Sequence, residues 1–181
     1  MSEYNCKIAD FNEIIKKWDY EISIHPNDEN WIIWKNKSIA GYNNNNQLCY
    51  IGVLDGEIIT EATAMLSAVE VQNSDGLVNA DTVYLCAFRT RKEYQGQGYF
   101  SRLYHFMEND LRQKGYKALT LGVEPDDQKN IEIYFKYGFT HLIKTAYEIY
   151  PDGERILVAY YSKSLQEKDM QQIIYDKEIR L

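Results

Sequence analysis

The sequence has few cysteines and no long apolar run, and both shortages argue against whole classes of protein. The three cysteines, Cys6, Cys49 and Cys86, are far apart, odd in number and outside any CxxC or Cys/His cluster, which argues against a zinc site. Free thiols of this kind suit a reducing compartment. The N-terminus lacks the apolar segment of a signal peptide, and no stretch approaches the roughly 18 apolar residues of a membrane span. We therefore expect a soluble cytoplasmic protein with no metal and no membrane partner.

Basic residues are also in the minority. Lys and Arg number 20 against 27 Asp and Glu, which gives a formal net charge of −7. Nucleic-acid binding needs a basic face that neutralises phosphates, so this balance argues against a nucleic-acid partner. The acidic balance is better suited to a cationic small partner.

Hydrophobic periodicity predicts an α/β protein, a mixed sheet with helices packed on it. Asp10 is the expected N-cap of the first helix, and Asp55-Gly56 is typical of a hairpin turn between two strands. The predicted elements are two helices (10–22 and 30–40), three strands (47–54, 57–71 and 82–90), a helix (101–114), a strand (116–123), a helix (126–137) and two strands (140–150 and 154–165).

The length of the chain, 181 residues, predicts one domain with a core large enough to fold without disulfides or metals. We expect that domain to cover residues 1–165, with N-terminal helices in 1–46 and the core in 47–165. Residues 166–181 are expected to form a polar helical tail.

A basic turn between a strand and a helix carries two of the ten glycines. In RKEYQGQGYFSRL, residues 91–103, Gly96 and Gly98 stand just before a helix start expected at Tyr99 or Ser101. The first N–H groups of a helix have no internal partner, and glycine lets the backbone come close to a ligand. Cations outnumber acids here: Arg89, Arg91, Lys92 and Arg102 against Glu93. The turn is thus a candidate phosphate site, with a plain tight turn as the alternative.

Two common phosphate motifs do not match this turn, but the motifs of another family do. A P-loop needs GxxxxGK[ST] and a dinucleotide site needs GxGxxG, whereas this chain reads GQGYFS. QGQGYF resembles the pyrophosphate loop of the GNAT superfamily of N-acetyltransferases, Q/R-x-x-G-x-G/A. Gln95 and Gly98 match this pattern, whereas Phe100 stands at the last position, where the family usually has a small residue. DDQKNIEIYFKYGF resembles the second motif of that family, in which a tyrosine, here Tyr134, precedes Gly-Phe by four residues.

The resemblance covers about residues 47–165 and implies a fold, a co-substrate and binding residues. The implied fold is a mixed, mostly antiparallel sheet flanked by helices, and the implied co-substrate is acetyl-CoA, with no metal. The strand before the turn would contact the pantetheine arm and the thioester through its backbone, at Phe88, Arg89 and Thr90. The turn would hold the pyrophosphate through its backbone, at Gln95, Gly96, Gln97, Gly98, Tyr99, Phe100 and Ser101. Asp127 stands where the family usually has an asparagine that contacts the pantetheine arm, with Asn130 nearby.

Two residues are candidates for the chemistry of acetyl transfer. The resemblance implies that Tyr134 protonates the departing thiolate, and packing is its alternative role. For the base we choose Glu70, because its parity on the predicted strand 57–71 places it on the apolar face, where desolvation would raise the pKa of its carboxyl group. A strand end or a bulge would instead turn Glu70 outward. Glu61 and Asp81 are weaker candidates.

The predicted activity is acetyl transfer from acetyl-CoA to a primary amine of a cationic small molecule or a peptide. A cationic acceptor is expected because the charged residues between Lys37 and Arg89 are all acidic: Asp55, Glu57, Glu61, Glu70, Asp75 and Asp81. Three further acids, Glu124, Asp126 and Asp127, follow the strand that is expected to border the acceptor side of the cleft. The alternative is an acyl-CoA-binding sensor or partner-binding module of the same fold without turnover. An enzyme that acetylates aminoacyl-tRNA would be expected to carry a basic face, which the net charge argues against. The acceptor, the acyl chain length and a homodimeric state are left open.

Overall fold

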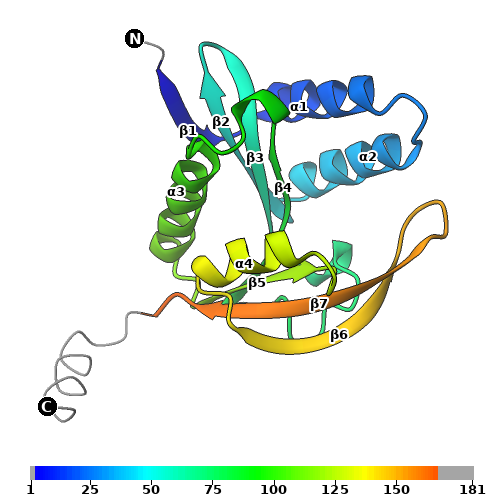
Figure 1. Cartoon of the computed structure of the whole chain (residues 1–181), viewed down its shortest axis with the longest axis vertical. Coiled ribbons are helices and arrows are strands. Elements are labelled where there is room, and N and C mark those ends of the chain that lie inside the picture. Colours follow the sequence, from blue (N-terminus) through cyan, green and yellow to red (C-terminus); the bar gives the residue numbers. More distant parts are fainter. Residues whose placement is uncertain (1–2, 167–181) are drawn as a thin grey trace, which may run out of the picture.

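The computed structural model describes residues 3–166 as one seven-stranded sheet flanked by helices (Figure 1). The helices are α1 (Phe11–Ile24), α2 (Asn30–Asn43), α3 (Tyr99–Gln113) and α4 (Gln128–Lys136). The strands are β1 (Tyr4–Ile8), β2 (Gln47–Leu54), β3 (Glu57–Met65), β4 (Thr82–Thr90), β5 (Ala118–Val123), β6 (His141–Ile149) and β7 (Arg155–Ser164). The predicted tail lies, from residue 167 on, outside the described residues. Within residues 3–166, no helix has the length and apolarity needed to cross a membrane.

The strands are arranged in the order β1-β2-β3-β4-β5-β7-β6. Among the pairs of the described sheet, β4 and β5 run parallel, and all other neighbours run antiparallel. The expectation of a mixed, mostly antiparallel sheet flanked by helices is therefore confirmed.

The centre of the sheet is covered on both faces. Tyr50 of β2 packs in one cluster with Leu103 and Met107 of α3, while its neighbour Ile51 packs in another with Ile14 of α1. Because successive side chains of a strand point to opposite faces, a strand with a core on each side needs apolar residues throughout. This explains why β2 reads as a continuous apolar run rather than as an alternating one.

The two parallel strands separate halfway along their length. Thr82 to Leu85 of β4 pair with Ala118 to Leu121 of β5. Beyond these residues β4 continues only alongside β3, and β5 only alongside β7. The separation leaves the second half of β4 with one sheet neighbour instead of two.

Several boundaries differ from the predicted ones. β1 was not predicted, because YNCKI is a five-residue edge strand with little apolar periodicity. α2 continues past Gly41, which allows a close contact: a Cβ there would lie 2.9 Å from Oε1 of Gln47. β3 ends at Met65 rather than at residue 71, and a short 3-10 helix follows at Ala68–Glu70.

The start of α1 agrees with the prediction. The carboxylate of Asp10 accepts a hydrogen bond from the N–H of Glu13 at 2.9 Å, and the carboxylate of Glu13 accepts one from the N–H of Asp10 at 3.0 Å. This reciprocal capping box satisfies two N–H groups at the helix start.

Candidate active site

The glycine turn lies between β4 and α3. A short 3-10 helix, Lys92–Tyr94, follows β4, and α3 begins at Tyr99. Gly96 and Gly98 have φ angles of +73° and +80°, in the left-handed region that glycine adopts without strain. Gly98 is the N-cap of α3 and makes no side-chain cap hydrogen bond. The first turn of α3 therefore presents N–H groups that are suited to an anion.

The arginines of the turn do not supply the positive charge that the sequence suggested. Arg89 donates to Oε1 of Glu61 at 2.6 Å, and Arg91 donates to Oε2 of Glu57 at 3.3 Å. Arg102 donates to the carbonyl oxygen of Tyr4 at 3.1 Å. All three guanidinium groups are bound within the protein, which leaves the backbone N–H groups, and the exposed Lys92 among the four cations, as candidate anion donors of this turn.

A cleft of about 460 Å³, the first cleft, lies against the turn. Its lining residues come from the end of β4, the turn and one face of α4: Phe88, Arg89, Thr90, Tyr94, Gln95, Gly96, Gly98, Tyr99, Phe100, Ser101, Lys129, Asn130, Ile133, Tyr134 and Tyr137. The structure thus brings together ten of the twelve residues predicted to bind the co-substrate. The exceptions are Gln97, whose amide donates to the carbonyl oxygen of Glu93 at 2.9 Å, and Asp127.

Asp127 caps α4. Its carboxylate accepts hydrogen bonds from the backbone N–H of Asn130 at 3.1 Å and from the side-chain amide of Asn130 at 2.6 Å. Both carboxylate oxygens are thus engaged in holding the start of α4, while Asn130 lines the first cleft.

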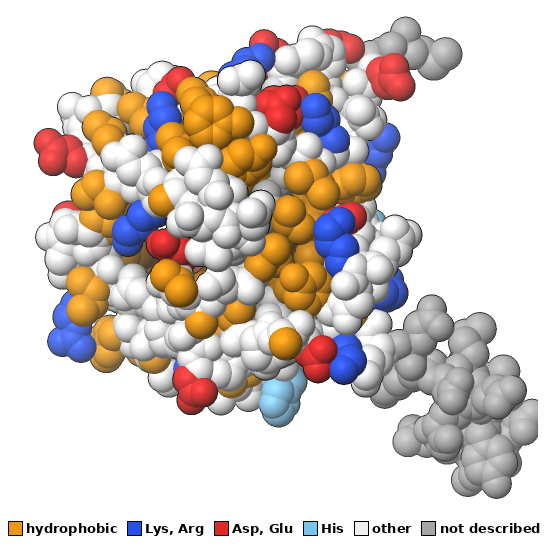
Figure 2. Space-filling view, turned by 180° about the vertical axis from the view of Figure 1, so that it is seen from behind, with side chains coloured by type: hydrophobic (Ala, Val, Ile, Leu, Met, Phe, Trp, Pro, Cys, Tyr) orange, Lys and Arg blue, Asp and Glu red, His pale blue; other side chains and the backbone are white. Residues whose placement is uncertain are grey.

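A second cleft, of about 260 Å³, opens where β4 and β5 separate. It is lined by Tyr84, Leu85, Cys86, Ala87, Phe88, Leu121, Gly122, Val123, Glu124, Asp127, Asn130, Tyr134, Glu148, Tyr150, Ile156 and Val158. These residues include three carboxylates and no lysine or arginine. Seen from the side opposite to Figure 1, the molecule has a hollow with acidic atoms visible inside it (Figure 2).

Tyr134 stands where the two clefts meet. Three residues line both clefts: Phe88, Asn130 and Tyr134. The ring centroids of Phe88 and Tyr134 are 5.8 Å apart, in an edge-to-face arrangement. Burial and then the nearby charge of Asp127 raise the pKa of Tyr134 to about 12. The phenol is therefore protonated at neutral pH.

Glu70 does not lie on a strand, so the parity that placed it on an apolar face does not apply. The strand on which its parity was counted ends at Met65, and Glu70 is the last residue of the 3-10 helix that follows. It is half-exposed and lines neither the first nor the second cleft. The parity rule fails here because it holds only while the strand continues.

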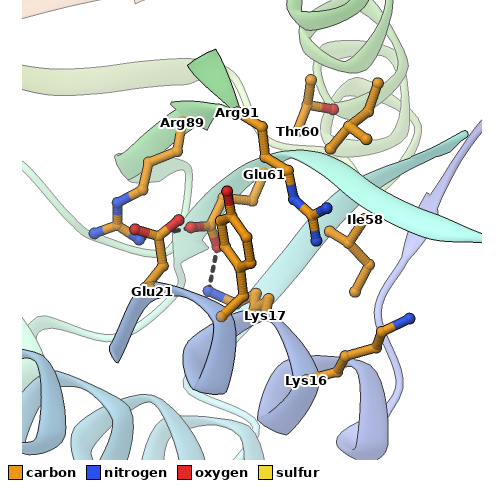
Figure 3. Close-up of a pocket in the computed structure, with 10 residues that line it drawn as sticks. Lys16, Lys17, Glu21, Ile58, Thr60, Glu61, Arg89 and Arg91 are labelled. Carbon is orange, nitrogen blue, oxygen red and sulfur yellow. Dashed lines mark hydrogen bonds and ion pairs between the residues drawn. The ribbon is translucent and has the colours of Figure 1, made fainter. Parts of the chain in front are cut away.

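The two weaker candidates for the base are engaged in ion pairs. Glu61 is 4% exposed and pairs with Lys17 and Arg89 (Figure 3). Burial raises the pKa of Glu61, but the two cations outweigh burial, and the pKa is lowered. Asp81 pairs with Lys117 at 2.9 Å.

The turn of the β6–β7 hairpin is attached to α2 beside the second cleft. The side chain of Asn30 donates to the carboxylate of Asp152 at 2.9 Å and accepts from the backbone N–H of Asp152 at 3.0 Å. Trp34 packs edge-to-face on Tyr150 with ring centroids 5.4 Å apart. We call these four residues the strap. Figure 1 shows the hairpin curving up toward α2.

Sequence reasoning missed part of both linings. Ile133 and Tyr137 were missed, although they recur at helical spacing with the predicted Asn130 and Tyr134, a signal that would have extended the first cleft along α4. No local signal existed for Glu148 and Tyr150, which line the second cleft because β7 and β6 follow β5 in the sheet. Among residues 3–166, no group of three or more His, Cys, Asp or Glu side chains is arranged to hold a metal ion.

Comparisons with solved structures show which fold this is. The ribosomal-protein-S18-alanine N-acetyltransferase from Escherichia coli superposes with a TM-score of 0.66 at 18% identity, over 92% of this chain and 98% of that one. An N-acetyltransferase from Staphylococcus aureus Mu50 gives 0.64 at 15% identity, over 91% and 100%. The protein yncA from Salmonella typhimurium, solved with its cofactor acetyl-CoA, gives 0.65 at 14% identity, over 92% and 96%.

The family is shown by sequence. No curated protein matches the chain in sequence. The family model described as acetyltransferase (GNAT) family matches residues 7–139, which is more than half of the chain. This match confirms the resemblance drawn from the two motifs. The chain belongs to the acetyltransferase (GNAT) family and is therefore an acyltransferase.

Proposed function

We propose that the chain transfers an acetyl group from acetyl-CoA to the primary amine of a cationic small molecule or a peptide. The observation that carries this proposal is the position of Tyr134 in the lining of two clefts of opposite character. One cleft offers N–H groups at a helix start, and the other offers carboxylates. Two substrates bound in these clefts would meet beside one protonated phenol.

The first cleft fits acetyl-CoA. Left-handed Gly96 and Gly98 leave open space where a side chain would otherwise stand, since a Cβ at either position meets no atom within 4 Å. The uncapped start of α3 suits a pyrophosphate, and Lys129 adds a cation to the lining. The volume of about 460 Å³ lies in the range of roughly 300–1,000 Å³ that is usual for ligand sites. When bound, acetyl-CoA supplies the thioester whose acyl carbon the amine attacks.

Tyr134 is suited to the acid step. Transfer forms a bond between the amine nitrogen and the acyl carbon and breaks the bond between that carbon and sulfur. The amine loses a proton to a base or to water, and the departing thiolate gains one from the phenol. A free thiolate, with a thiol pKa of about 8.5, is a weaker base than the phenolate of Tyr134, so the phenol donates to the sulfur while the carbon–sulfur bond breaks, and it regains a proton from the amine or from water. The raised pKa of Tyr134 keeps that proton available at neutral pH.

The attack by the amine is direct. Cys86 is the one cysteine in the lining of the second cleft, and burial raises the pKa of its thiol to about 12. A nucleophilic cysteine needs its thiolate form, which this thiol does not reach at neutral pH. An acyl-enzyme on Cys86 is therefore not part of the proposal.

The carboxylates of the second cleft are suited to a cationic amine. An amine with a pKa of about 10.4 is neutral in only about one part in 2,500 at pH 7, which corresponds to about 4.6 kcal/mol. Glu124 and Glu148 line this cleft and would attract the cation and accept its proton, directly or through water. In the proposed function they replace Glu70.

An amine panel tests this proposal. Release of free thiol from acetyl-CoA is followed at low salt with spermidine, a basic peptide, glycine and glutamate as acceptors. We expect the first two to react at least about tenfold faster in kcat/KM, because the acidic lining attracts cations. Faster reaction of glycine or glutamate contradicts a cationic acceptor. Thermal stabilisation by acetyl-CoA without thiol release from any amine contradicts turnover and indicates an acyl-CoA-binding module.

A further inference from the structure

Three charged side chains meet beside the strand that borders the first cleft, two of them buried and the third, Arg89, 25% exposed. They come from three elements: Lys17 from α1, Glu61 from β3 and Arg89 from β4 (Figure 3). Glu61 accepts from Lys17 on one carboxylate oxygen and from Arg89, at 2.6 Å, on the other. Lys17 and Glu61 are each 4% exposed. The acid thus ties the first helix to both central strands.

Aromatic rings close this cluster on its other side. The guanidinium carbon of Arg89 lies 4.7 Å from the ring centroid of Trp31 and 5.2 Å from that of Trp18. The ammonium group of Lys17 lies 4.3 Å from the ring centroid of Trp18. The rings shield the cations from water and restrict where the side chain of Arg89 can lie.

The anchored arginine directly follows an irregularity in β4. Glu61 pairs with Arg89 across the two strands, but Thr63 pairs with Cys86, so one residue of β3 faces two residues of β4. Ala87, the first of those two, has a φ of +54°, which is unfavourable for a residue other than glycine. Such a bulge persists only where its surroundings hold it.

The bulge places Phe88 where the two clefts meet, beside Tyr134. Phe88 lines both clefts, and its ring centroid lies 5.1 Å from that of Phe100 and 5.8 Å from that of Tyr134. If β4 relaxed to a regular strand, residues after Cys86 would shift by one position, and side chains would exchange faces. Phe88 would then leave the place where the two clefts meet.

Packing alone does not account for a buried ion cluster at this position. Burying the charges of Lys17 and Glu61 is costly, and apolar residues of similar volume often stabilise a fold as well or better. We propose that Glu61 is a positioning residue of the acetyl-transfer site: through Arg89 it holds the β4 bulge in the shape that receives the acyl end of the co-substrate. Glu61 itself touches no substrate. This inference rests on the proposed function, because it assigns the acyl end to the neighbourhood of Phe88.

The test separates the two ends of the co-substrate. Binding of acetyl-CoA and of 3′-phospho-ADP, its nucleotide end, is measured by calorimetry on the wild type, on Glu61→Gln and on the triple variant Lys17→Met, Glu61→Leu and Arg89→Met. The triple variant replaces the three charges by apolar side chains and leaves Glu21, which is 9% exposed, with His25 at 3.8 Å as its charged neighbour. Glu61→Gln keeps the shape of the side chain and serves where the triple variant does not fold.

We expect both variants to bind 3′-phospho-ADP within twofold of the wild type, because the turn and α3 are unchanged. Affinity for acetyl-CoA, or kcat for acetyl transfer, should fall by at least about tenfold in the triple variant and by less in Glu61→Gln. Retention of acetyl-CoA affinity and of kcat within twofold in a folded variant overturns the proposal. Equal loss of both affinities also overturns it, since that pattern indicates a general loss of structure.

Glu108 provides a matched control. It is 8% exposed and bridges a lysine and an arginine, Lys163 at 2.5 Å and Arg112 at 3.0 Å, but lines neither cleft. Glu108→Gln should lower the Tm as Glu61→Gln does and leave the ratio of the two affinities unchanged. A similar change of that ratio in Glu108→Gln overturns the specific role of Glu61. Failure of the wild type to bind acetyl-CoA contradicts the proposed function itself and is seen before any variant is made.

Discussion

The two clefts that meet at Tyr134 are built in different ways. The first is lined mainly by residues 88–101, one strand end, one turn and one helix start, with one face of α4 opposite. The second is lined by side chains from β4, β5, β6 and β7 and from the start of α4. Backbone groups shape the first cleft, whereas side chains give the second its charge. In the proposed function, the binding of the co-substrate therefore depends on a local motif, and the choice of acceptor depends on the tertiary arrangement of the sheet.

The largest expected effect concerns the first cleft alone. Gly98→Val places a β-branched residue at a φ of +80° and a side chain where the pyrophosphate would approach the backbone. We expect acetyl-CoA affinity to fall by more than about 100-fold. Wild-type protein at 100 times its Kd should gain about 2.7 kcal/mol of stability, and the variant should gain almost none. A thermal melting series with acetyl-CoA measures this difference.

Gly115→Val is the control for strain. Gly115 also has a positive φ, of +92°, and open space around its would-be Cβ, but it follows α3 and lines neither cleft. This variant should melt at a lower temperature and keep the full stabilisation by acetyl-CoA. A normal shift in Gly98→Val would contradict the location of the co-substrate.

The next largest effect is expected at Tyr134, which lines both clefts. Tyr134→Phe keeps the ring against Phe88 and removes only the hydroxyl. Loss of a general acid typically lowers the rate by about 10²–10⁴-fold, so we expect kcat to fall by roughly 10²-fold while acetyl-CoA affinity stays within about twofold. Steady-state kinetics and calorimetry measure the two quantities. Tyr137→Phe is the matched control, because Tyr137 lines the first cleft only and should keep its kcat.

The pH profile gives an independent check on Tyr134. A general acid works in its protonated form, so its contribution is lost as the pH rises through its pKa. Because burial raises the pKa of Tyr134 to about 12, no descending limb should occur below about pH 10. The kcat/KM for an alkylamine should instead rise about tenfold per pH unit from pH 7, as the neutral amine becomes more abundant. A descending limb near pH 8 would exclude Tyr134 as the acid.

The difference between the clefts also explains how far the sequence could predict them. The first cleft was largely predicted, because glycines, a strand end and a helix start within 14 residues carry their own conformational rules. The second cleft was predicted only in part: Glu124 and Asp127, expected on the acceptor side, line it, but Glu148 enters it through a sheet order in which β7 precedes β6. The parity assumed for Glu70, which does not lie on a strand, and the ion pair of Arg89 with Glu61 were missed for the same reason. Strand ends, bulges and ion-pair partners are set by tertiary packing and leave no local pattern.

A smaller effect is expected from the charge of the second cleft. Glu148→Gln keeps the size of the side chain and an oxygen that can accept from the hydroxyl of Tyr160, now at 2.8 Å. We expect KM for spermidine to rise about tenfold, or about 1.4 kcal/mol, with acetyl-CoA affinity unchanged. The difference in KM between the wild type and Glu148→Gln should become smaller as salt is added, because salt screens the attraction between charges that are not in contact. Glu154→Gln, on the exposed hairpin turn, should change neither constant. An unchanged KM in Glu148→Gln would remove this carboxylate from the acceptor site.

The smallest effect should come from the strap, which joins the second cleft to α2 without contributing to the first. Asn30→Ala removes both hydrogen bonds to Asp152, so we expect the Tm to fall by about 4–8 °C, twice the shift typical of one net hydrogen bond in a chain of this size. KM for the amine should rise about two- to threefold because the hairpin that carries Tyr150 becomes less fixed, while acetyl-CoA affinity stays the same. Asn109→Ala, which loses a single hydrogen bond from Arg112 on the surface of α3, is the control and should leave KM unchanged.

The strap should also depend on pH. Hydrogen bonds from the N–H of Glu154 and from Asn30 lower the pKa of Asp152. A carboxyl group with a lowered pKa stabilises the fold at pH values above its ordinary pKa, and that contribution is lost as the pH falls. The difference in Tm between wild type and Asn30→Ala should therefore shrink below about pH 4, and a difference that stays constant into acid would show that the charge of Asp152 plays no part in the strap.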